Sequence, residues 1–270
     1  MEMEEKYRLC IDGLKDFAAS IGATDFVIGL SGGLDSTVVA ALAVDAFGAQ
    51  HVHGVLMPGP YSSDHSISDA QDLAQRLGMC ARTVSIAAPF AALKEAFQEG
   101  WGEELVGLAA ENSQARLRMT VLMALSNQYG WMLINTGNKS EAMMGYSTLY
   151  GDTAGAYAPI GGLYKTDVFA LAEWMNQRAR KAGQVEPVPQ HVIDKPPSAE
   201  LSEGQQDEKS LGVCYAELDQ ILIGLVEQGL SVEEVAAQGF DAAQVERINR
   251  TMRGYAFKRA LEPPFPVIPY

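Results

Sequence analysis

The sequence contains only three cysteines and no long apolar run. Both features exclude classes of protein that the chain could otherwise belong to. Its three cysteines, Cys10, Cys80 and Cys214, are far apart and form no C-x-x-C pair, which argues against a disulfide framework or a cysteine-rich zinc site. The apolar run from Thr37 to Val44 ends at a charge, well short of a membrane-spanning length. The acidic start MEMEEKYR lacks the basic and apolar regions of a secretory signal. We therefore expect a cytoplasmic protein.

Basic residues are also scarce, since 20 Lys and Arg stand against 34 Asp and Glu, for a net charge of -14. A field of this sign repels polyphosphate backbones, which argues against nucleic acid and anionic membranes as partners. Any phosphate that the protein binds must therefore be held locally, by backbone amides, a few cations or a metal ion.

Short apolar runs alternate with helical patterns through the first half of the chain. The predicted strands are Phe26–Leu30, His53–Met57, Ala81–Ile86 and Trp131–Asn135, and the predicted helices around them are Glu4–Ser20, Ser36–Phe47, Asp64–Leu77, Pro89–Glu99 and Gly107–Gln128. This alternation is typical of an α/β fold with a mostly parallel sheet flanked by helices. We place the sheet core at about residues 22–136.

The second half, about residues 137–270, is predicted to consist of helices and two long loops. The predicted helices are Asp167–Lys181, Tyr215–Gln228, Ser231–Gln238 and Asp241–Arg259. The loops, Gly145–Gly162 and Val185–Pro197, are long enough to carry substrate contacts rather than simply connect elements. We expect a single domain over 1–270 with a helical C-terminal part.

The segment Gly29-Leu30-Ser31-Gly32-Gly33-Leu34-Asp35-Ser36 lies between a predicted strand and a predicted helix. Glycines let the backbone approach an anion closely, and a helix start directs free N–H groups and the positive end of its dipole at that anion. We interpret the segment as a pyrophosphate-binding loop. It is not a Walker A loop, because that loop has a lysine where this chain has Asp35.

An acid beside a phosphate is repulsive unless a divalent cation lies between them, so Asp35 favours bound Mg²⁺. The structural alternative is an ordinary turn between strand and helix, in which Asp35 only complements the helix dipole.

The S-G-G-x-D-S pattern resembles the loop of the N-type ATP pyrophosphatases, which cleave ATP to AMP and pyrophosphate while adenylating a substrate. Later segments narrow the resemblance, in order and spacing, to the NAD synthetase family: Asn112–Met119, Thr136–Glu141, Tyr150–Asp152, Pro159–Thr166 and Pro197–Leu201. The resemblance implies a Rossmann-like, adenine nucleotide alpha hydrolase-like fold. It also implies ATP-dependent amidation of deamido-NAD to NAD by ammonia, through an acyl adenylate, with release of AMP and pyrophosphate.

The same resemblance implies roles for individual residues. Asp35 and Glu141 would hold Mg²⁺, and with Lys165 they would form the catalytic set. The residues expected to contact ATP are Gly29, Leu30, Ser31, Gly32, Gly33, Leu34, Asp35, Ser36, Thr136, Lys165 and Ser198. The residues expected to contact the dinucleotide are Asn112, Arg116, Asp152, Phe257 and Lys258.

Several of these positions also have a structural interpretation. Glu141 follows Asn138 at the spacing of a capping box. Arg116 fits a surface arginine equally well. Thr166 is expected to cap the helix that follows Lys165, where the helix dipole disfavours a cation unless an anionic ligand is bound.

The chain departs from the family pattern at two dinucleotide contacts. Many members have a lysine and an acid where this chain has Leu149 and Ala156, so those contacts are missing or replaced. Because the pyrophosphate loop begins at Gly29, we expect no fused glutaminase domain, and ammonia would be free or delivered by a separate glutaminase partner. The family usually forms homodimers.

Two other functions remain open at this point. Another N-type ATP pyrophosphatase, such as a GMP-synthetase-like amidase or a tRNA-modifying ligase, would share the loop. A non-catalytic adenine-nucleotide-binding protein would use it without turnover.

Overall fold

The centre of the molecule is a parallel sheet of four strands in the order β3-β2-β1-β4. The strands are β1 (Phe26–Gly29), β2 (Val52–Leu56), β3 (Cys80–Thr83) and β4 (Met132–Leu133) in a computed structural model that describes all 270 residues. In register, Phe26 lies opposite Val52 on one side and Met132 on the other. The predicted α/β fold with a parallel sheet is confirmed.

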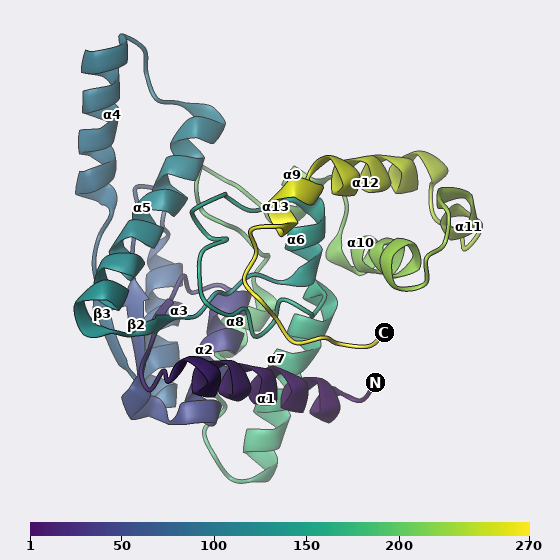
Figure 1. Ribbon diagram of the computed structural model, residues 1–270, viewed down its shortest axis with the longest axis horizontal. Helices are drawn as coiled ribbons and strands as arrows, with labels where there is room; N and C mark the ends of the chain where they lie inside the picture. The colour runs from purple at the N-terminus through teal and green to yellow at the C-terminus, as the bar shows by residue number, and fades with distance from the viewer.

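Helices cover both faces of the sheet (Figure 1). Their bounds are α1 (Met3–Ile21), α2 (Leu34–Phe47), η1 (Ala49–His51), α3 (Asp64–Leu77), α4 (Ala87–Trp101), α5 (Gly107–Tyr129), α6 (Lys139–Met144), α7 (Lys165–Lys181), α8 (Gln190–Asp194), α9 (Asp207–Leu211), α10 (Tyr215–Leu222), η2 (Ile223–Glu227), α11 (Val232–Ala236), α12 (Ala242–Gly254) and α13 (Ala256–Arg259).

The alternation of β1 side chains explains the layers. Phe26 and Ile28 are buried in the main core with residues of α1, α2, α3, α7 and α8, whereas Val27 belongs to a smaller cluster that α5 covers. Helix α2 lies inside this core, because its residues from Ser36 to Ala43 are all buried. That burial explains why α2 is apolar all round rather than amphipathic.

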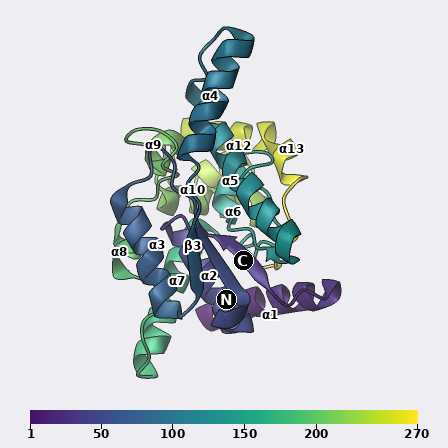
Figure 2. The ribbon, with the colours of Figure 1, turned by 90° about the vertical axis from the view of Figure 1, so that its left-hand side faces the viewer.

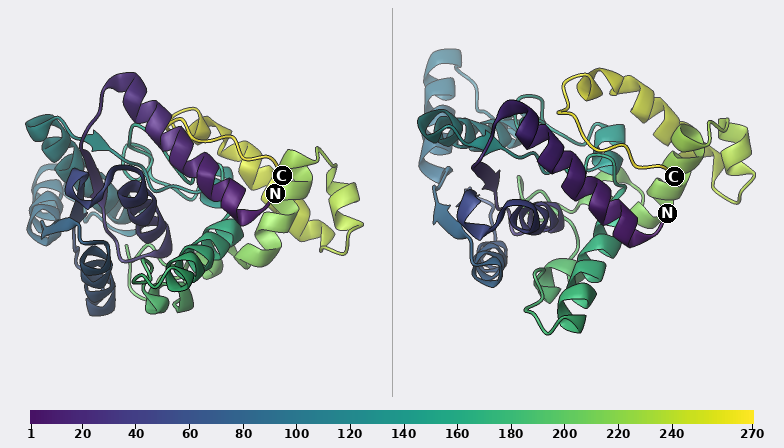
Figure 3. Two further views of the ribbon diagram at one scale, coloured as in Figure 1. Left: turned by 90° about the horizontal axis from the view of Figure 1, so that it is seen from below. Right: turned by 60° about the horizontal axis from the view of Figure 1, so that its bottom comes forward.

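A separate helical lobe is formed by the C-terminal part of the chain. Its core combines Met144 of α6 with residues of α10, α11 and α12, and Tyr164 joins it from the segment before α7. Figure 3 shows this lobe to one side of the sheet, with the two chain ends next to each other. The ends meet where the Lys6 ammonium lies 4.5 Å from the ring centroid of Tyr270. Figure 2 shows that α4 projects beyond the rest of the molecule.

The fourth strand is shorter than predicted, and the chain after it pairs with an unexpected partner. Strand β4 ends at Leu133, and Ile134 then forms an isolated parallel bridge with Tyr157. The Ala156 N–H donates to Leu133 O at 2.8 Å, and the Asn135 N–H donates to Tyr157 O at 2.9 Å. The predicted loop 145–162 therefore returns to the sheet edge, which sequence periodicity did not indicate.

Two predicted C-terminal helices are divided. The helix predicted over Tyr215–Gln228 is α-helical to Leu222 and then widens into the π-helical turn η2, where Gly224 lies so close to α11 that an added Cβ would come within 2.8 Å of Val235. The helix predicted over Asp241–Arg259 breaks at Tyr255, which packs against Gly145 and separates α12 from α13.

Strand order places the site. Strands β1, β2 and β3 follow one another outward, and the chain then returns to add β4 on the other side of β1. Helix α2, which follows β1, and helix α5, which leads into β4, lie on opposite faces of the sheet, and ligands of open α/β sheets bind at the carboxyl ends of strands where such a change of face occurs. The loop that we expect to bind pyrophosphate follows β1 at this point.

We expect Gly32→Ala to destabilise the protein more than Gly78→Ala does. Both glycines have a left-handed backbone, but only at Gly32 would the added Cβ meet neighbouring atoms. Gly32 has φ +76°, and an added Cβ would lie 2.1 Å from the carbonyl oxygen of Ser66, so the loop or α3 must move. Gly78→Ala is the control, because Gly78 has φ +65° with nothing within 4 Å. Both variants carry left-handed strain of about 1 kcal/mol, and overpacking should cost Gly32→Ala about 1–3 kcal/mol more. Thermal and urea unfolding measure the difference, and equal losses would contradict the close packing of the loop on α3.

Candidate functional site

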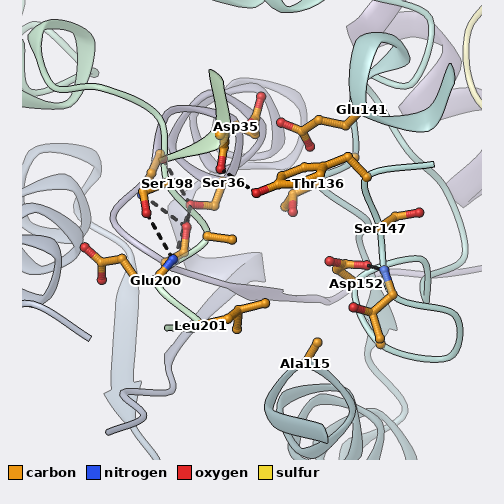
Figure 4. A pocket seen from close by; sticks show the side chains of 18 of the residues that line it. Asp35, Ser36, Ala115, Thr136, Glu141, Ser147, Asp152, Ser198, Glu200 and Leu201 are labelled. Carbon is orange, nitrogen blue, oxygen red and sulfur yellow. Dashed lines mark hydrogen bonds between the residues drawn. The ribbon is translucent and has the colours of Figure 1, made fainter. Parts of the chain in front are cut away.

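A cavity of about 1340 Å³ opens beyond the carboxyl ends of β1 and β4 (Figure 4). Its wall combines the loop after β1, the N-terminal half of α5, the segment after β4, the loop 145–154 and the segment 195–207. A single drug-sized ligand occupies about 300–1,000 Å³, so this cavity has room for two ligands of moderate size.

The loop after β1 is held by two serines. The Ser31 and Ser36 hydroxyls lie 2.9 Å apart, and Ser31 Oγ accepts the Gly33 N–H at 3.1 Å. Helix α2 has no side-chain cap, and its first intrahelical bond runs from the Thr37 N–H to Gly33 O. The N–H groups of Leu34, Asp35 and Ser36 therefore remain available to an anion at the helix start.

Asp35, at the start of α2, and Glu141, in α6, share one cation. Lys165 Nζ lies 2.5 Å from Asp35 Oδ2 and 2.9 Å from Glu141 Oε1, and its side chain is 2% exposed. Burial acts to lower the pKa of Lys165, but attraction to the two carboxylates outweighs it and raises the pKa. Burial also raises the pKa of Asp35, against the opposing attraction of Lys165. The fold thus brings together the three residues that the sequence analysis expected to be catalytic, Asp35, Glu141 and Lys165.

The start of α7 is stabilised by side chains from elsewhere, not by Thr166. The helix begins at Lys165, two residues earlier than expected, so the prediction that Thr166 caps it is wrong. Asp219 Oδ2 accepts the Thr166 N–H at 2.8 Å, and Ser140 Oγ accepts the Lys165 N–H at 2.8 Å. Ser140 in turn donates to Asp219 Oδ1. The buried carboxylate offsets the placement of a lysine at a helix N-terminus.

Of the two hydrogen bonds that make a capping box, the segment Asn138–Glu141 forms only one. Asn138 Oδ1 accepts the Glu141 N–H at 3.0 Å and so caps α6. The Glu141 carboxylate does not return the bond, and instead contacts Lys165 and accepts the Tyr215 hydroxyl at 3.3 Å. Asn138 Nδ2 also donates to Asp35 Oδ1 at 3.1 Å. The cap therefore leaves the Glu141 carboxylate in the cavity.

Asn112 and Arg116 on α5 both line the cavity next to the loop 145–154. Asn112 Oδ1 accepts the Thr148 hydroxyl at 2.7 Å, and Arg116 Nε donates to Leu149 O at 3.1 Å. Arg116 forms no ion pair, so its guanidinium can still bind an anion. At Leu149, where the family pattern has a lysine, this chain contributes its backbone carbonyl to Arg116.

The remaining expected dinucleotide contacts divide between the cavity and the surface. Asp152 lines the cavity and accepts the Thr148 N–H at 2.6 Å, and desolvation by the surrounding protein raises its pKa to about 6. Lys258 also lines the cavity, and its ammonium donates to the carbonyls of Gly145 and Ser147 at 2.7 and 2.6 Å. Phe257 does not reach the cavity, because α13 is a single turn that directs it outward, and it is 58% exposed.

The two isolated hydroxyls predicted to contact ATP both lie on the cavity wall. Thr136 follows the end of β4 and faces the cavity near Glu141 (Figure 4). Ser198 lies in the proline-flanked segment, where its hydroxyl donates to Gln205 O at 2.7 Å. Gly32 itself is buried behind the loop rather than on the wall.

Several residues that sequence reasoning missed also form this wall. Arg118, whose Nε donates to Met57 O, is enclosed so deeply that burial lowers its pKa to about 10. Ser147 Oγ on this wall is a buried polar atom without a hydrogen-bond partner, and a bound ligand could supply one. The available sequence signal was their place within blocks already recognised, such as Asn112–Met119.

The donor set of the cavity fits a hard cation. Asp35 Oδ2 and Glu141 Oε1 lie within 2.9 Å of one nitrogen atom, so one ion could contact both oxygens. Oxygen ligands from one or two carboxylates, completed by phosphate and water, suit Mg²⁺. No group of three His, Cys, Asp or Glu residues is arranged to hold a metal ion. No helix of the chain is both long and apolar enough to cross a membrane.

Comparison with known proteins identifies the family of the chain. The NAD synthase family model matches residues 6–262. The chain belongs to the NAD synthase family. It is 46% identical over 270 residues to the glutamine-dependent NAD(+) synthetase of Rhodobacter capsulatus, and 43% identical over 256 residues to that of Thermotoga maritima. These matches cover 98% and 95% of this chain but 48% and 44% of the relatives, so the chain spans about half the length of the curated relatives it matches.

Solved structures share the fold. The NMN synthetase of Francisella tularensis superposes with a TM-score of 0.79 and 33% identity, over 96% of each chain. The NH3-dependent NAD synthetase of Campylobacter jejuni gives a TM-score of 0.73 and 27% identity, again over 96% of each chain. The glutamine-dependent NAD+ synthetase of Acinetobacter baumannii, in complex with ADP, gives 0.69 and 33% identity over 100% of this chain and 48% of that chain.

We expect Asp219→Ala to lower both stability and turnover. The change leaves the Ser140 hydroxyl and the Thr166 N–H without their buried acceptor, at a cost of about 2–4 kcal/mol. Asp241→Ala removes an exposed helix cap instead, which accepts the Gln244 N–H, and should cost about 1 kcal/mol without affecting turnover. Urea unfolding and AMP release measure the two effects. If Asp219→Ala were as active as Asp241→Ala, Asp219 would not be needed to position Lys165.

Proposed function

We propose that the chain catalyses ATP-dependent amidation of deamido-NAD to NAD, with ammonia as the nitrogen donor and AMP and pyrophosphate as by-products. The observation that carries the proposal is the Asp35–Lys165–Glu141 cluster, which faces the free helix-start amides of the loop after β1 across one cavity. Family membership supports it. The residue roles expected from the sequence are part of the proposal.

In the first step, the nicotinate carboxylate attacks the α-phosphorus of ATP and forms an acyl adenylate, while pyrophosphate leaves. The chain supplies positioning and charge stabilisation rather than a nucleophile. The amides at the start of α2 would hold the departing pyrophosphate, and Lys165 would place a buried positive charge beside it. Thr136 and Ser198 would hold the rest of ATP.

In the second step, ammonia attacks the acyl carbon, and AMP leaves. Adenylation is needed because a carboxylate resists amine attack until it carries a good leaving group. Arg116, Asn112, Asp152 and Lys258 would keep the dinucleotide in place during both steps.

We propose that Asp35 and Glu141 hold Mg²⁺ when ATP is bound. The ion would neutralise negative charge on the triphosphate. Lys165, which joins the two carboxylates here, would then be free to contact phosphate oxygens.

Ammonia is proposed as the species that attacks the acyl adenylate in this cavity, because it is the nucleophile that the amide product requires. The curated relatives are glutamine-dependent and about twice as long. A separate glutaminase partner could deliver ammonia, and a homodimer is the proposed assembly.

We expect the 270-residue chain to release AMP with ATP, Mg²⁺, deamido-NAD and ammonium chloride, and to release about background amounts when glutamine replaces ammonium. Chromatography of AMP and NAD measures both products. Release of AMP with no acceptor requirement would point to another ATP pyrophosphatase, and ATP binding without any turnover would point to a non-catalytic nucleotide-binding protein.

We expect Asp35→Asn to lower turnover at least about 100-fold with little effect on unfolding, because it removes one metal ligand and one charge that holds Lys165. Asp45→Asn is the matched control, since Asp45 forms a surface pair with Arg178 away from the cavity. Steady-state AMP release and thermal unfolding check both variants. An Asp35→Asn enzyme with the control's rate would refute the metal role.

A second candidate substrate is nicotinic acid mononucleotide. The Francisella tularensis structure that superposes over 96% of both chains is described as an NMN synthetase. Leu149 and Ala156 also remove two expected contacts to the larger dinucleotide. Comparing kcat/KM for deamido-NAD and for the mononucleotide decides between the two.

A further inference from the structure

The segment 195–207 forms one wall of the cavity, and all of its residues line it. It has no regular secondary structure before α9 begins at Asp207, so its position depends on side-chain contacts. Figure 4 shows Ser198 and Glu200 on this wall, on the opposite side of the cavity from Ser147 and Asp152.

Glu200 fastens this segment to the start of α3. Its carboxylate accepts the Ser63 N–H at 3.1 Å, the Ser63 hydroxyl at 2.7 Å and the Ser66 hydroxyl at 2.8 Å. Ser63 is the N-cap of α3, where the positive end of the helix dipole favours a carboxylate. Burial acts to raise the pKa of Glu200, but these hydrogen bonds outweigh it and lower the pKa.

The backbone of Glu200 has a strained conformation, and the hydrogen bonds of its side chain account for it. Glu200 has φ +48°, in the left-handed region that residues with a Cβ disfavour. Such strain persists only where surrounding contacts hold it, and it gathers at ligand clamps. Three hydrogen bonds to one carboxylate are a sufficient cause.

The same residue is tied to Ser198. The Glu200 N–H donates to Ser198 Oγ at 3.2 Å, so the place of the carboxylate on α3 fixes the place of this hydroxyl. Two further contacts support the segment from other directions: Leu201 O accepts Gln114 Nε2 at 2.9 Å, and Lys195 Nζ contacts Asp69 at 2.7 Å.

Ser66 connects this clamp to the pyrophosphate loop. Its backbone lies so close to Gly32 that a Cβ there would come within 2.1 Å of the Ser66 carbonyl oxygen. The start of α3 therefore touches the loop on one side and the Glu200 carboxylate on the other.

We propose that Glu200 is a positioning residue, which holds the segment 195–207 on α3 so that Ser198 and the pyrophosphate loop close around one nucleotide. The inference rests on the proposed function for the identity of that nucleotide, ATP. The Glu200 carboxylate itself touches no reacting atom.

The test compares Glu200→Ala, Glu200→Gln and Glu200→Gly. Glycine removes both the carboxylate and the backbone strain, whereas glutamine keeps an acceptor oxygen without the charge. Glu203→Gln is the matched control, because Glu203 lies on the same segment and its carboxylate, unlike that of Glu200, accepts no hydrogen bond from the protein. We expect Ala and Gly to raise the KM for ATP about 10-fold or more, with kcat changed less than about 3-fold, and Gln to recover part of the loss.

Hydrogen exchange supplies a readout that does not need turnover. In Glu200→Ala, peptides covering 195–207 should exchange faster, while those of β1 and α2 keep the wild-type rate. Calorimetric ATP affinity should fall in parallel with the rise in KM. If the wild type binds ATP but makes no NAD, the proposed function fails, yet exchange and affinity still decide the role of Glu200.

Unchanged exchange over 195–207 with unchanged ATP affinity would overturn the proposal. Faster exchange throughout the sheet would also overturn it, because Glu200 would then support folding in general rather than this segment. A Gly variant that restores wild-type affinity would show that the carboxylate does not hold the segment.

Discussion

The arrangement of the site depends on one buried ammonium held between two carboxylates. Lys165 is 2% exposed, and removing its charge from water is tolerable only because Asp35 and Glu141 both contact it. Asp35 comes from the loop after β1, Glu141 from α6, and Lys165 from α7. One charge cluster thus joins the sheet to the C-terminal half of the chain. Three elements distant in sequence must fold together before any of these charges is compensated.

Two helix starts around the cavity receive hydrogen-bond partners from distant parts of the chain. Asp219 and Ser140 serve α7, and Glu200 serves α3. The start of α2 has no such side chain. Because unpaired helix-start amides attract anions and residues 34–36 line the cavity, a phosphate group would bind there.

At Leu149 and Ala156, where the resemblance to the family implied charged contacts to a dinucleotide, the backbone forms hydrogen bonds within the protein. The Leu149 carbonyl accepts Arg116, and the Ala156 N–H extends the sheet by pairing with Leu133. At both positions the backbone, rather than a charged side chain, makes the contact.

The sequence by itself determined the parallel α/β fold and the loop after β1, because strand and helix periodicity and short motifs are local signals. The grouping of Asp35, Glu141 and Lys165 followed only from the resemblance to the NAD synthetase family. It did not determine the end of β4, the break at Tyr255 or the outward direction of Phe257, since each depends on packing against residues far along the chain. Asp219 and Glu200 were invisible for the same reason: a carboxylate that caps a distant helix has no local pattern. Only the tertiary structure decided which free amides received a partner and which were left for a ligand.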